Sequence, residues 1–304
     1  LALQTHVLMT ILVLGGTGTV GRSVVRGLLD TGAAVRVLTR SVNHFDRIPS
    51  PATGVLGDLT DPTTLNGTFE GIDRLFLLNA VSPTELQQGL VALQEARRCG
   101  VERVVYLSVH HAERGPHVPH FASKGAMERA LDASGLDVTI LRANNFFQND
   151  GWSKDALLAY GIYPQPIGDV GLSRIDAGDV AHAAVNALTQ DSHVGRTYAL
   201  VGPDVLTGAA CAAVYADALG DASIQYAGND LDAWSAQAAR MLPSWMVYDL
   251  RLMYALFQAE GLVATDADHE QTRNLLGRAP RPFADFAADL TAEWTDRDVP
   301  RATA

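Results

Sequence analysis

Apolar runs alternate with stretches of helical periodicity over the first 145 residues of the chain. Near-continuous apolar runs are typical of strands that are buried on both faces of a parallel sheet. The predicted strands are Thr10–Leu14, Ala34–Thr39, Val55–Asp58, Arg74–Leu78, Arg103–Ser108 and Val138–Leu141. The predicted helices are Thr19–Leu29, Leu86–Arg98 and His120–Ala133. This alternation predicts an α/β fold with helices on both faces of the sheet and right-handed crossovers.

The alternation weakens beyond residue 145. Asp150–Leu172 is rich in Gly and Pro, which predicts a loop. Asp179–Thr189 has a helical pattern, and Thr197–Val201 is a strand that we expect to rejoin the sheet. From Thr207 to Trp294 the pattern is mostly helical.

Composition narrows the class of protein. The 304 residues are 47% hydrophobic and 19% charged, as in an ordinary globular protein. A net charge of −11 argues against nucleic acid or an anionic membrane as a partner, and no apolar run approaches the roughly 18 residues of a membrane span. Two cysteines give no disulfide framework, so we expect a cytoplasmic location.

The first eight residues precede Met9, which stands directly before the first predicted strand. Residues 1–8 are interpreted as an upstream extension or an alternative start. They lack the basic segment that begins a secretory signal.

The first strand and the first helix are joined by the glycine-rich segment Gly15–Gly21. Its glycines fit both G-x-G-x-x-G and G-x-x-G-x-x-G, spacings that let a backbone turn tightly against a pyrophosphate at a helix N-terminus. A strand before it and a helix after it supply the context that this motif requires. The segment, including Gly15, Thr17, Gly18, Thr19, Val20 and Gly21, is therefore predicted to bind a dinucleotide.

The end of the second strand selects the dinucleotide. NAD-binding folds usually carry an acidic residue there, which binds the ribose 2′-hydroxyl. This strand ends Leu38-Thr39-Arg40-Ser41 without a carboxylate. The Arg40 guanidinium suits a 2′-phosphate, so NADP(H) is predicted over NAD(H).

Several segments in order resemble the NmrA-like group of atypical short-chain dehydrogenases/reductases. They are Gly15–Gly21, Arg40, Gly57–Asp61, Ser108, His120–Lys124, Leu141–Phe146 and Leu276–Phe283. The resemblance covers nearly the whole chain. It implies a doubly wound parallel Rossmann sheet with a smaller, mostly helical C-terminal region. We place the NAD(P)-binding domain at residues 9–205 and the substrate region at 206–304, with the loop 146–177 contributing.

The resemblance also implies roles for individual residues. Asp58 and Leu59 would flank the adenine, and Asn79 and Ala80 would lie along the cofactor. Lys124 would bind the nicotinamide ribose. The stretch Asn144, Asn145 and Phe146 would border the nicotinamide.

The catalytic residues depart from the pattern of short-chain dehydrogenases, which use Ser, Tyr and Lys. Ser108 and Lys124 are present, but the position four before the lysine is His120 instead of Tyr. The spacing places His120 and Lys124 on one helix face. His120 is interpreted either as a proton donor or as a packed or ribose-facing histidine.

The segment His110–His120 also contains His111 and His117. A metal site there is the alternative to a polar substrate rim or a surface loop, and we favour the rim or loop because no cysteine lies nearby. We do not predict a metal.

The substrate pocket is predicted from side chains beyond the strand ends and on the C-terminal helices. The candidates are His110, Phe147, Trp152, Trp245 and Met246, although for each residue taken singly a core position is the better interpretation. An aromatic and Met-rich lining favours a small apolar or aromatic substrate.

The sequence predicts an NADP(H)-dependent oxidoreductase that transfers hydride to a quinone, an aromatic ketone or a similar conjugated molecule, with natural-product metabolism as one setting. The alternative is a catalytically silent NADP(H) sensor that regulates a partner protein. The sequence does not decide between a homodimer and a complex with such a regulatory partner.

Overall fold

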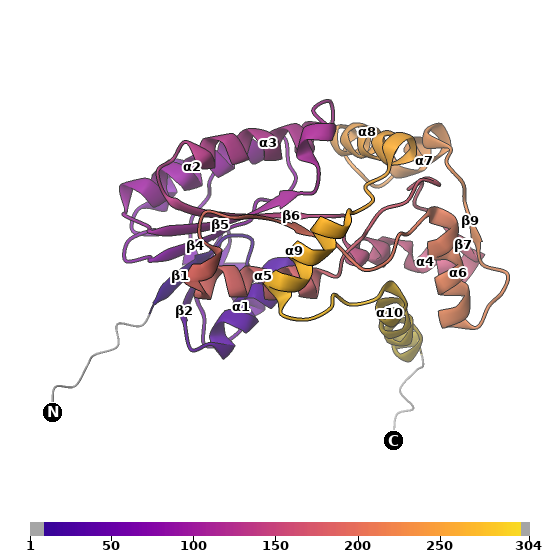
Figure 1. Cartoon of the computed structure of the whole chain (residues 1–304), viewed down its shortest axis with the longest axis horizontal. Coiled ribbons are helices and arrows are strands. Elements are labelled where there is room, and N and C mark those ends of the chain that lie inside the picture. The colour runs from indigo at the N-terminus through magenta and orange to yellow at the C-terminus, as the bar shows by residue number, and fades with distance from the viewer. Residues whose placement is uncertain (1–8, 299–304) are drawn as a thin grey trace, which may run out of the picture. The chain divides into compact units, whose positions relative to one another are not determined.

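The computed structural model of the chain describes residues 9–298, drawn in colour in Figure 1. Residues 1–8, interpreted above as an extension, lie outside the described residues. The chain forms two compact units. Unit 1 comprises the chain up to Pro116 with His120–Arg142 and Val180–Tyr198, and unit 2 comprises His117–Pro119, Ala143–Asp179 and the chain from Ala199 on. The predicted boundary at residue 205 remains a prediction.

Unit 1 is built on a seven-stranded sheet in the order β3-β2-β1-β4-β5-β6-β8. The neighbours from β3 to β5 all pair in parallel, with Ile11 opposite Val35 and Leu12 opposite Leu75. The strands are β1 (Thr10–Val13), β2 (Ala34–Thr39), β3 (Thr53–Leu56), β4 (Arg74–Leu77), β5 (Arg103–Val109), β6 (Asp137–Ala143) and β8 (Thr197–Leu200). The order reverses between β1 and β4, and ligands of open α/β sheets bind beyond the strand ends at such a point.

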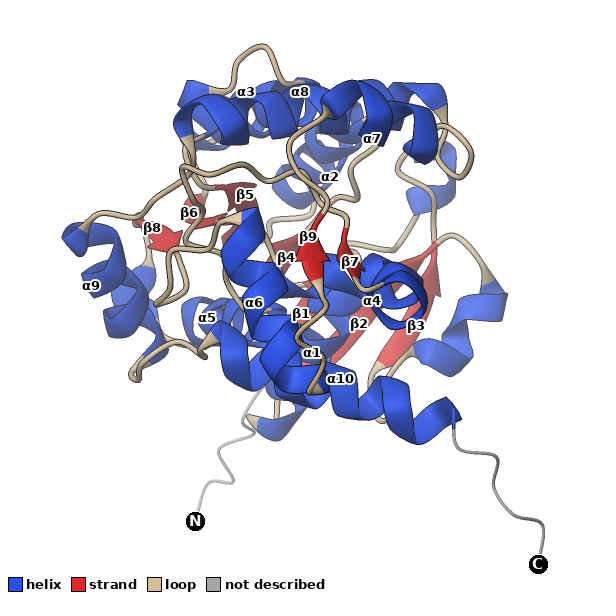
Figure 2. Cartoon of the chain, turned by 90° about the vertical axis from the view of Figure 1, so that its right-hand side faces the viewer, coloured by secondary structure: helices blue, strands red, loops and turns tan. Residues whose placement is uncertain are grey.

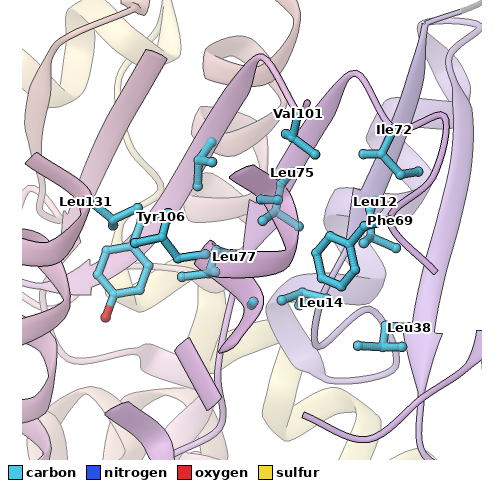
Figure 3. Close-up of a cluster of buried hydrophobic side chains, with 14 of the residues drawn as sticks. Leu12, Leu14, Leu38, Phe69, Ile72, Leu75, Leu77, Val101, Tyr106 and Leu131 are labelled. Carbon is cyan, nitrogen blue, oxygen red and sulfur yellow. The ribbon is translucent and has the colours of Figure 1, made fainter. Parts of the chain in front are cut away.

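Helices cover both faces of this sheet. They are α1 (Thr19–Asp30), α2 (Glu85–Arg98), α3 (Pro119–Asp132) and α5 (Ala177–Thr189). Figure 1 shows α2 and α3 on one face and α1 and α5 on the other. The apolar faces of the helices and strands meet in the core, and Figure 3 shows one such cluster. Its leucines come from β1, β2, β4, the segments after β1 and β3, and the helices α2 and α3, and Tyr106 of β5 lies at one end of the cluster.

Unit 2 is mostly helical, as the sequence predicts. Its helices are α4 (Lys154–Tyr160), α6 (Gly208–Leu219), α7 (Leu231–Ala238), α8 (Ser244–Glu260), α9 (Asp266–Leu276) and α10 (Phe283–Asp298). Two short parallel strands, β7 (Ile162–Tyr163) and β9 (Gln225–Tyr226), pack against α4 and α6, and Figure 2 shows the pair. Among the described residues, no helix is both long and apolar enough to cross a membrane.

The loop predicted over Asp150–Leu172 is wrong for its first half. The 3-10 helix Phe147–Ser153 leads into α4, and β7 follows. The glycines and prolines of the segment concentrate beyond Tyr160, so Lys154–Tyr160 is left with residues that favour a helix. Gly161 ends the helix in a left-handed conformation, with φ of 62°.

Candidate functional site

The turn Gly15–Gly21 lies at the point where the strand order of unit 1 reverses. Gly15 has a left-handed φ of 67°, and the amide of Gly18 donates to its carbonyl at 3.0 Å. A Cβ on Gly21 would lie 2.1 Å from the Gly15 carbonyl oxygen, so a side chain there would collide with the turn. A Cβ on Gly15 would lie 3.0 Å from the carbonyl of Leu78, directly before Asn79. The turn therefore depends on glycine and sits against the end of β4.

The N-terminus of α1 opens onto this turn. Gly18 is the N-cap, and among the described residues no side chain caps the helix end. The first turn, from Thr19 to Arg22, also carries no acidic residue. The first amide N–H groups of a helix have no partner within the helix, and the helix dipole favours an anion beside them. The arrangement suits a phosphate group.

Arg40 follows β2 and is exposed. Its guanidinium makes no hydrogen bond or ion pair with the part of the chain that the structure describes. The carboxylate of Asp58 in the loop after β3 accepts hydrogen bonds from the amide of Thr60 at 2.8 Å and from its hydroxyl at 2.7 Å. These bonds, and to a smaller extent the charge of Arg40, hold the pKa of Asp58 below its ordinary value. Leu59 beside it is buried.

Lys124 lies inside unit 1. Its Nζ is 2.9 Å from Glu85 Oε1 and donates to the carbonyl of Leu107 at 3.0 Å. It also lies over the ring of Tyr106, 5.3 Å from the centroid. Asn79 Nδ2 donates to the backbone carbonyl of Glu85 at 3.2 Å. Two predicted site residues, Asn79 and Lys124, are thus linked through Glu85, which the sequence analysis missed.

Ser108 is committed to a different partner. Its hydroxyl donates to Glu128, and the Glu128 carboxylate also pairs with Arg142, whose Nη2 lies 2.6 Å away. His120 stands one helical turn before Lys124 on α3 and is half-buried, with its ring edge-on to Phe121. His110 is buried, and the centroid of its ring lies 3.9 Å from the ring centroid of His111. Ser108, His120 and Lys124 therefore share unit 1, but Ser108 and Lys124 face separate carboxylates.

Unit 2 holds the stretch Asn144–Phe146. Asn144 Nδ2 donates to the carbonyl of Leu262 at 2.8 Å. Arg174 donates to Asn145 Oδ1 at 3.0 Å and to the carbonyl of Phe146 at 2.9 Å. Phe147 is fully buried against Phe283 and Phe286.

The other pocket candidates in unit 2 differ in exposure. Trp152 is 74% exposed, whereas Trp245 and Met246 in the first turn of α8 are half-buried. Their role in binding a substrate stays a prediction.

Arg174 belongs to a buried network that the sequence analysis missed. Both Arg174 and Asp150 are fully buried, and Arg174 Nη2 lies 2.7 Å from Asp150 Oδ1. The Asp150 carboxylate also accepts hydrogen bonds from Tyr163, Gln165 and Tyr215, at 3.1, 2.6 and 3.0 Å. The partners are far apart in sequence, so no local pattern marks the network.

The glycine turn, the open helix end and the reversed strand order of unit 1 place the protein in the Rossmann class of dinucleotide-binding folds. Within that class, the chain belongs to the NmrA-like family, whose model matches residues 8–286. The predicted fold class and the predicted family are both confirmed.

Characterised relatives span nearly the whole chain. The NAD(P)H azoreductase of Xenophilus azovorans is 30% identical, over 91% of this chain and 96% of its own. The (4-alkanoyl-5-oxo-2,5-dihydrofuran-3-yl)methyl phosphate reductase of Streptomyces griseus is 33% identical, over 92% of this chain and 97% of its own.

A solved structure has the same fold. The NADPH-dependent quinone oxidoreductase of Escherichia coli, in complex with NADPH, superposes with a TM-score of 0.83. It covers 92% of this chain and 99% of its own at 23% identity, a level at which the likeness concerns the fold.

Proposed function

We propose that the protein is an NADPH-dependent reductase of aromatic substrates, and that it transfers hydride to a quinone, an aromatic ketone or a similar conjugated acceptor. The observation that carries the proposal is the glycine turn of Gly15–Gly21 against the uncapped N-terminus of α1. The names of the relatives, an azoreductase and a reductase of an unsaturated lactone, support reductase chemistry on conjugated molecules.

The residues of unit 1 fit NADP(H). A pyrophosphate would lie against the amides that open α1, where the missing side chain at Gly21 keeps the turn tight. Arg40 would bind the 2′-phosphate, because its exposed guanidinium forms no hydrogen bond or ion pair with the described residues and no carboxylate ends β2. Asp58, Leu59, Asn79 and Ala80 would line the adenosine and the rest of the cofactor.

NADPH supplies the hydride when it is bound. The family resemblance implies that Lys124 would bind the nicotinamide ribose and that the stretch Asn144–Phe146 would border the nicotinamide. A conjugated acceptor needs little help from an acid, because its ring system delocalises the incoming charge; this suits a chain with histidine in place of the usual tyrosine. His120 is the proposed proton donor, while the hydroxyl of Ser108 is held by Glu128.

The test is NADPH oxidation by the purified protein across a panel of quinones, polycyclic aromatic ketones and azo dyes. We expect turnover with at least one acceptor. Gly21→Ala should abolish NADPH binding and turnover, because its Cβ would lie 2.1 Å from the Gly15 carbonyl oxygen. Gly151→Ala is the matched control, since a Cβ there meets no described atom within 4 Å.

Two outcomes would contradict the proposal. A protein that bound no NADPH would not be a reductase of this type. A protein that bound NADPH but reduced no acceptor, and whose affinity for a partner protein followed the NADPH/NADP⁺ ratio, would instead be a sensor.

A further inference from the structure

Glu85 is a buried carboxylate beside Lys124. It occupies the first turn of α2, where the helix dipole favours a negative charge. Its residue is only 4% exposed, and both carboxylate oxygens are shielded from solvent. A ligand therefore cannot reach Glu85 directly. Any effect on a bound molecule must pass through a neighbour.

The neighbour is Lys124. Glu85 Oε1 lies 2.9 Å from Lys124 Nζ, yet neither carboxylate oxygen has an aligned hydrogen bond from any described residue. Glu85 thus acts on Lys124 as a close counter-charge. The Leu107 carbonyl takes one of the three ammonium N–H groups. The side chain of Lys124 keeps 9% of its surface exposed, so part of it is open to a ligand.

Glu85 compensates the charge of the largely buried Lys124 ammonium. An ammonium on a flexible four-carbon stem is costly to bury without an opposite charge, and it would otherwise turn toward water. Glu85 and the Leu107 carbonyl hold the Lys124 ammonium beside β5. Asn79 fixes the position of Glu85, because its amide nitrogen donates to the Glu85 backbone carbonyl.

We propose that Glu85 is a positioning residue for dinucleotide binding: its buried carboxylate holds the Lys124 ammonium in place to bind the nicotinamide ribose. This rests on the proposed NADPH-dependent function. Glu85 touches neither cofactor nor substrate, and its whole contribution to binding runs through Lys124.

The experiment is a double-mutant cycle of NADPH affinity, measured by calorimetry on Glu85→Gln, Lys124→Met and the double variant. We expect each single substitution to weaken NADPH binding about ten- to a hundredfold, the range for a hydrogen bond to a charged group. The double variant should bind no more weakly than Lys124→Met alone, because Glu85 has nothing left to position. Glu85→Asp keeps the charge and should restore part of the affinity.

Asp191→Asn is the matched control. Asp191 Oδ1 lies 2.8 Å from Arg103, a buried cation at the other end of β5, so this variant also removes a carboxylate that faces a buried cation of unit 1. It should leave NADPH affinity unchanged. If Glu85→Gln does not fold, the cycle is run with Glu85→Asp, whose loss should likewise vanish in the Lys124→Met background.

The results distinguish a failure of the proposed role of Glu85 from a failure of the proposed function. Losses that add in the double variant, or a Glu85→Gln protein that binds NADPH like the wild type, would overturn the role of Glu85 and leave the proposed function standing. A wild-type protein that bound no NADPH would overturn both.

Discussion

Each unit of the protein contains a buried cation that faces a buried carboxylate, but the two pairs differ in how their hydrogen bonds are satisfied. In unit 2, Asp150 receives Arg174, two tyrosine hydroxyls and an amide, and Arg174 also donates to Asn145 and Phe146. In unit 1, Lys124 has Glu85 and one carbonyl, and the Glu85 carboxylate has no aligned hydrogen bond from the described residues.

The difference separates a structural pair from a pair that is available for binding. Buried charges are stable only when hydrogen bonds replace the water they lose. Arg174 and Asp150 meet that condition with partners from their own unit, so they need no ligand. Lys124 and Glu85 meet it only in part, which is expected of a site that a ligand completes.

The largest effect should follow from breaking the pair of unit 2. Asp150→Asn leaves the fully buried Arg174 without a counter-charge, so we expect the free energy of unfolding to fall by about 3–5 kcal/mol. Denaturant unfolding measures this loss. Glu85→Gln should lose less, because no aligned hydrogen bond from the described residues reaches the Glu85 carboxylate and Lys124 keeps some exposure.

An exposed carboxylate provides the control for that experiment. Asp217→Asn on α6 makes the same change of charge at the surface and should alter the free energy of unfolding by no more than about 0.5 kcal/mol. A loss for Asp150→Asn as small as this would show that the Asp150–Arg174 network does not stabilise the folded state.

A smaller effect should follow from removing one hydroxyl of the network. Burial, reinforced by Asp150, raises the pKa of Tyr215, so its hydroxyl stays a donor at neutral pH. Tyr215→Phe deletes its 3.0 Å hydrogen bond to Asp150 and should cost about 1.5–3 kcal/mol of unfolding free energy. Tyr106→Phe is the counterpart beside Lys124. It should cost less, because among the described residues the Tyr106 hydroxyl has no hydrogen-bond partner. Equal losses would remove the contrast between the two pairs.

Arg40 extends the comparison to an exposed cation that forms no hydrogen bond or ion pair with the described residues. Arg40→Ala should leave the free energy of unfolding unchanged but weaken NADPH binding about ten- to a hundredfold, because a charged contact to the 2′-phosphate is lost. NADH affinity should stay the same. Titration calorimetry with both dinucleotides measures this, and Arg97→Ala at the far end of α2 is the control. Equal losses for NADPH and NADH would place Arg40 away from the 2′-phosphate.

The sequence predicts best what local patterns determine. Strands such as Thr10–Val13 and Arg74–Leu77 are near-continuous apolar runs, and the glycine turn follows the first of them. The structure agrees because unit 1 is built from successive strand–helix repeats whose contacts follow the chain order. The prediction of NADP(H) likewise depends on a local feature, because Arg40 follows β2 where many NAD-binding folds have a carboxylate.

The sequence does not predict what distant partners determine. Asp150 depends on Tyr215, 65 residues away, and looks like part of a loop because glycines and prolines follow it. Glu85 is one more acidic residue at a helix start, where such residues are common. Its proposed role depends on its contact with Lys124, which lies on another helix. Neither carboxylate could be separated from surface acids without the tertiary contacts.

The smallest effect concerns pH, and it sets the conditions under which the two pairs should be compared. Burial, with the charges of Arg196 and Arg103, lowers the pKa of His193 below its ordinary value of 6.5. The folded protein therefore binds this proton less readily than the unfolded chain. The stability that neutral His193 contributes is present above pH 6.5 and is lost as the pH falls below it. His193→Gln should flatten the fall in unfolding free energy as the pH drops below 6.5, and denaturant unfolding at several pH values measures it. An unchanged slope would assign the fall to other groups, and the ion-pair variants could then be compared at acidic pH without this correction.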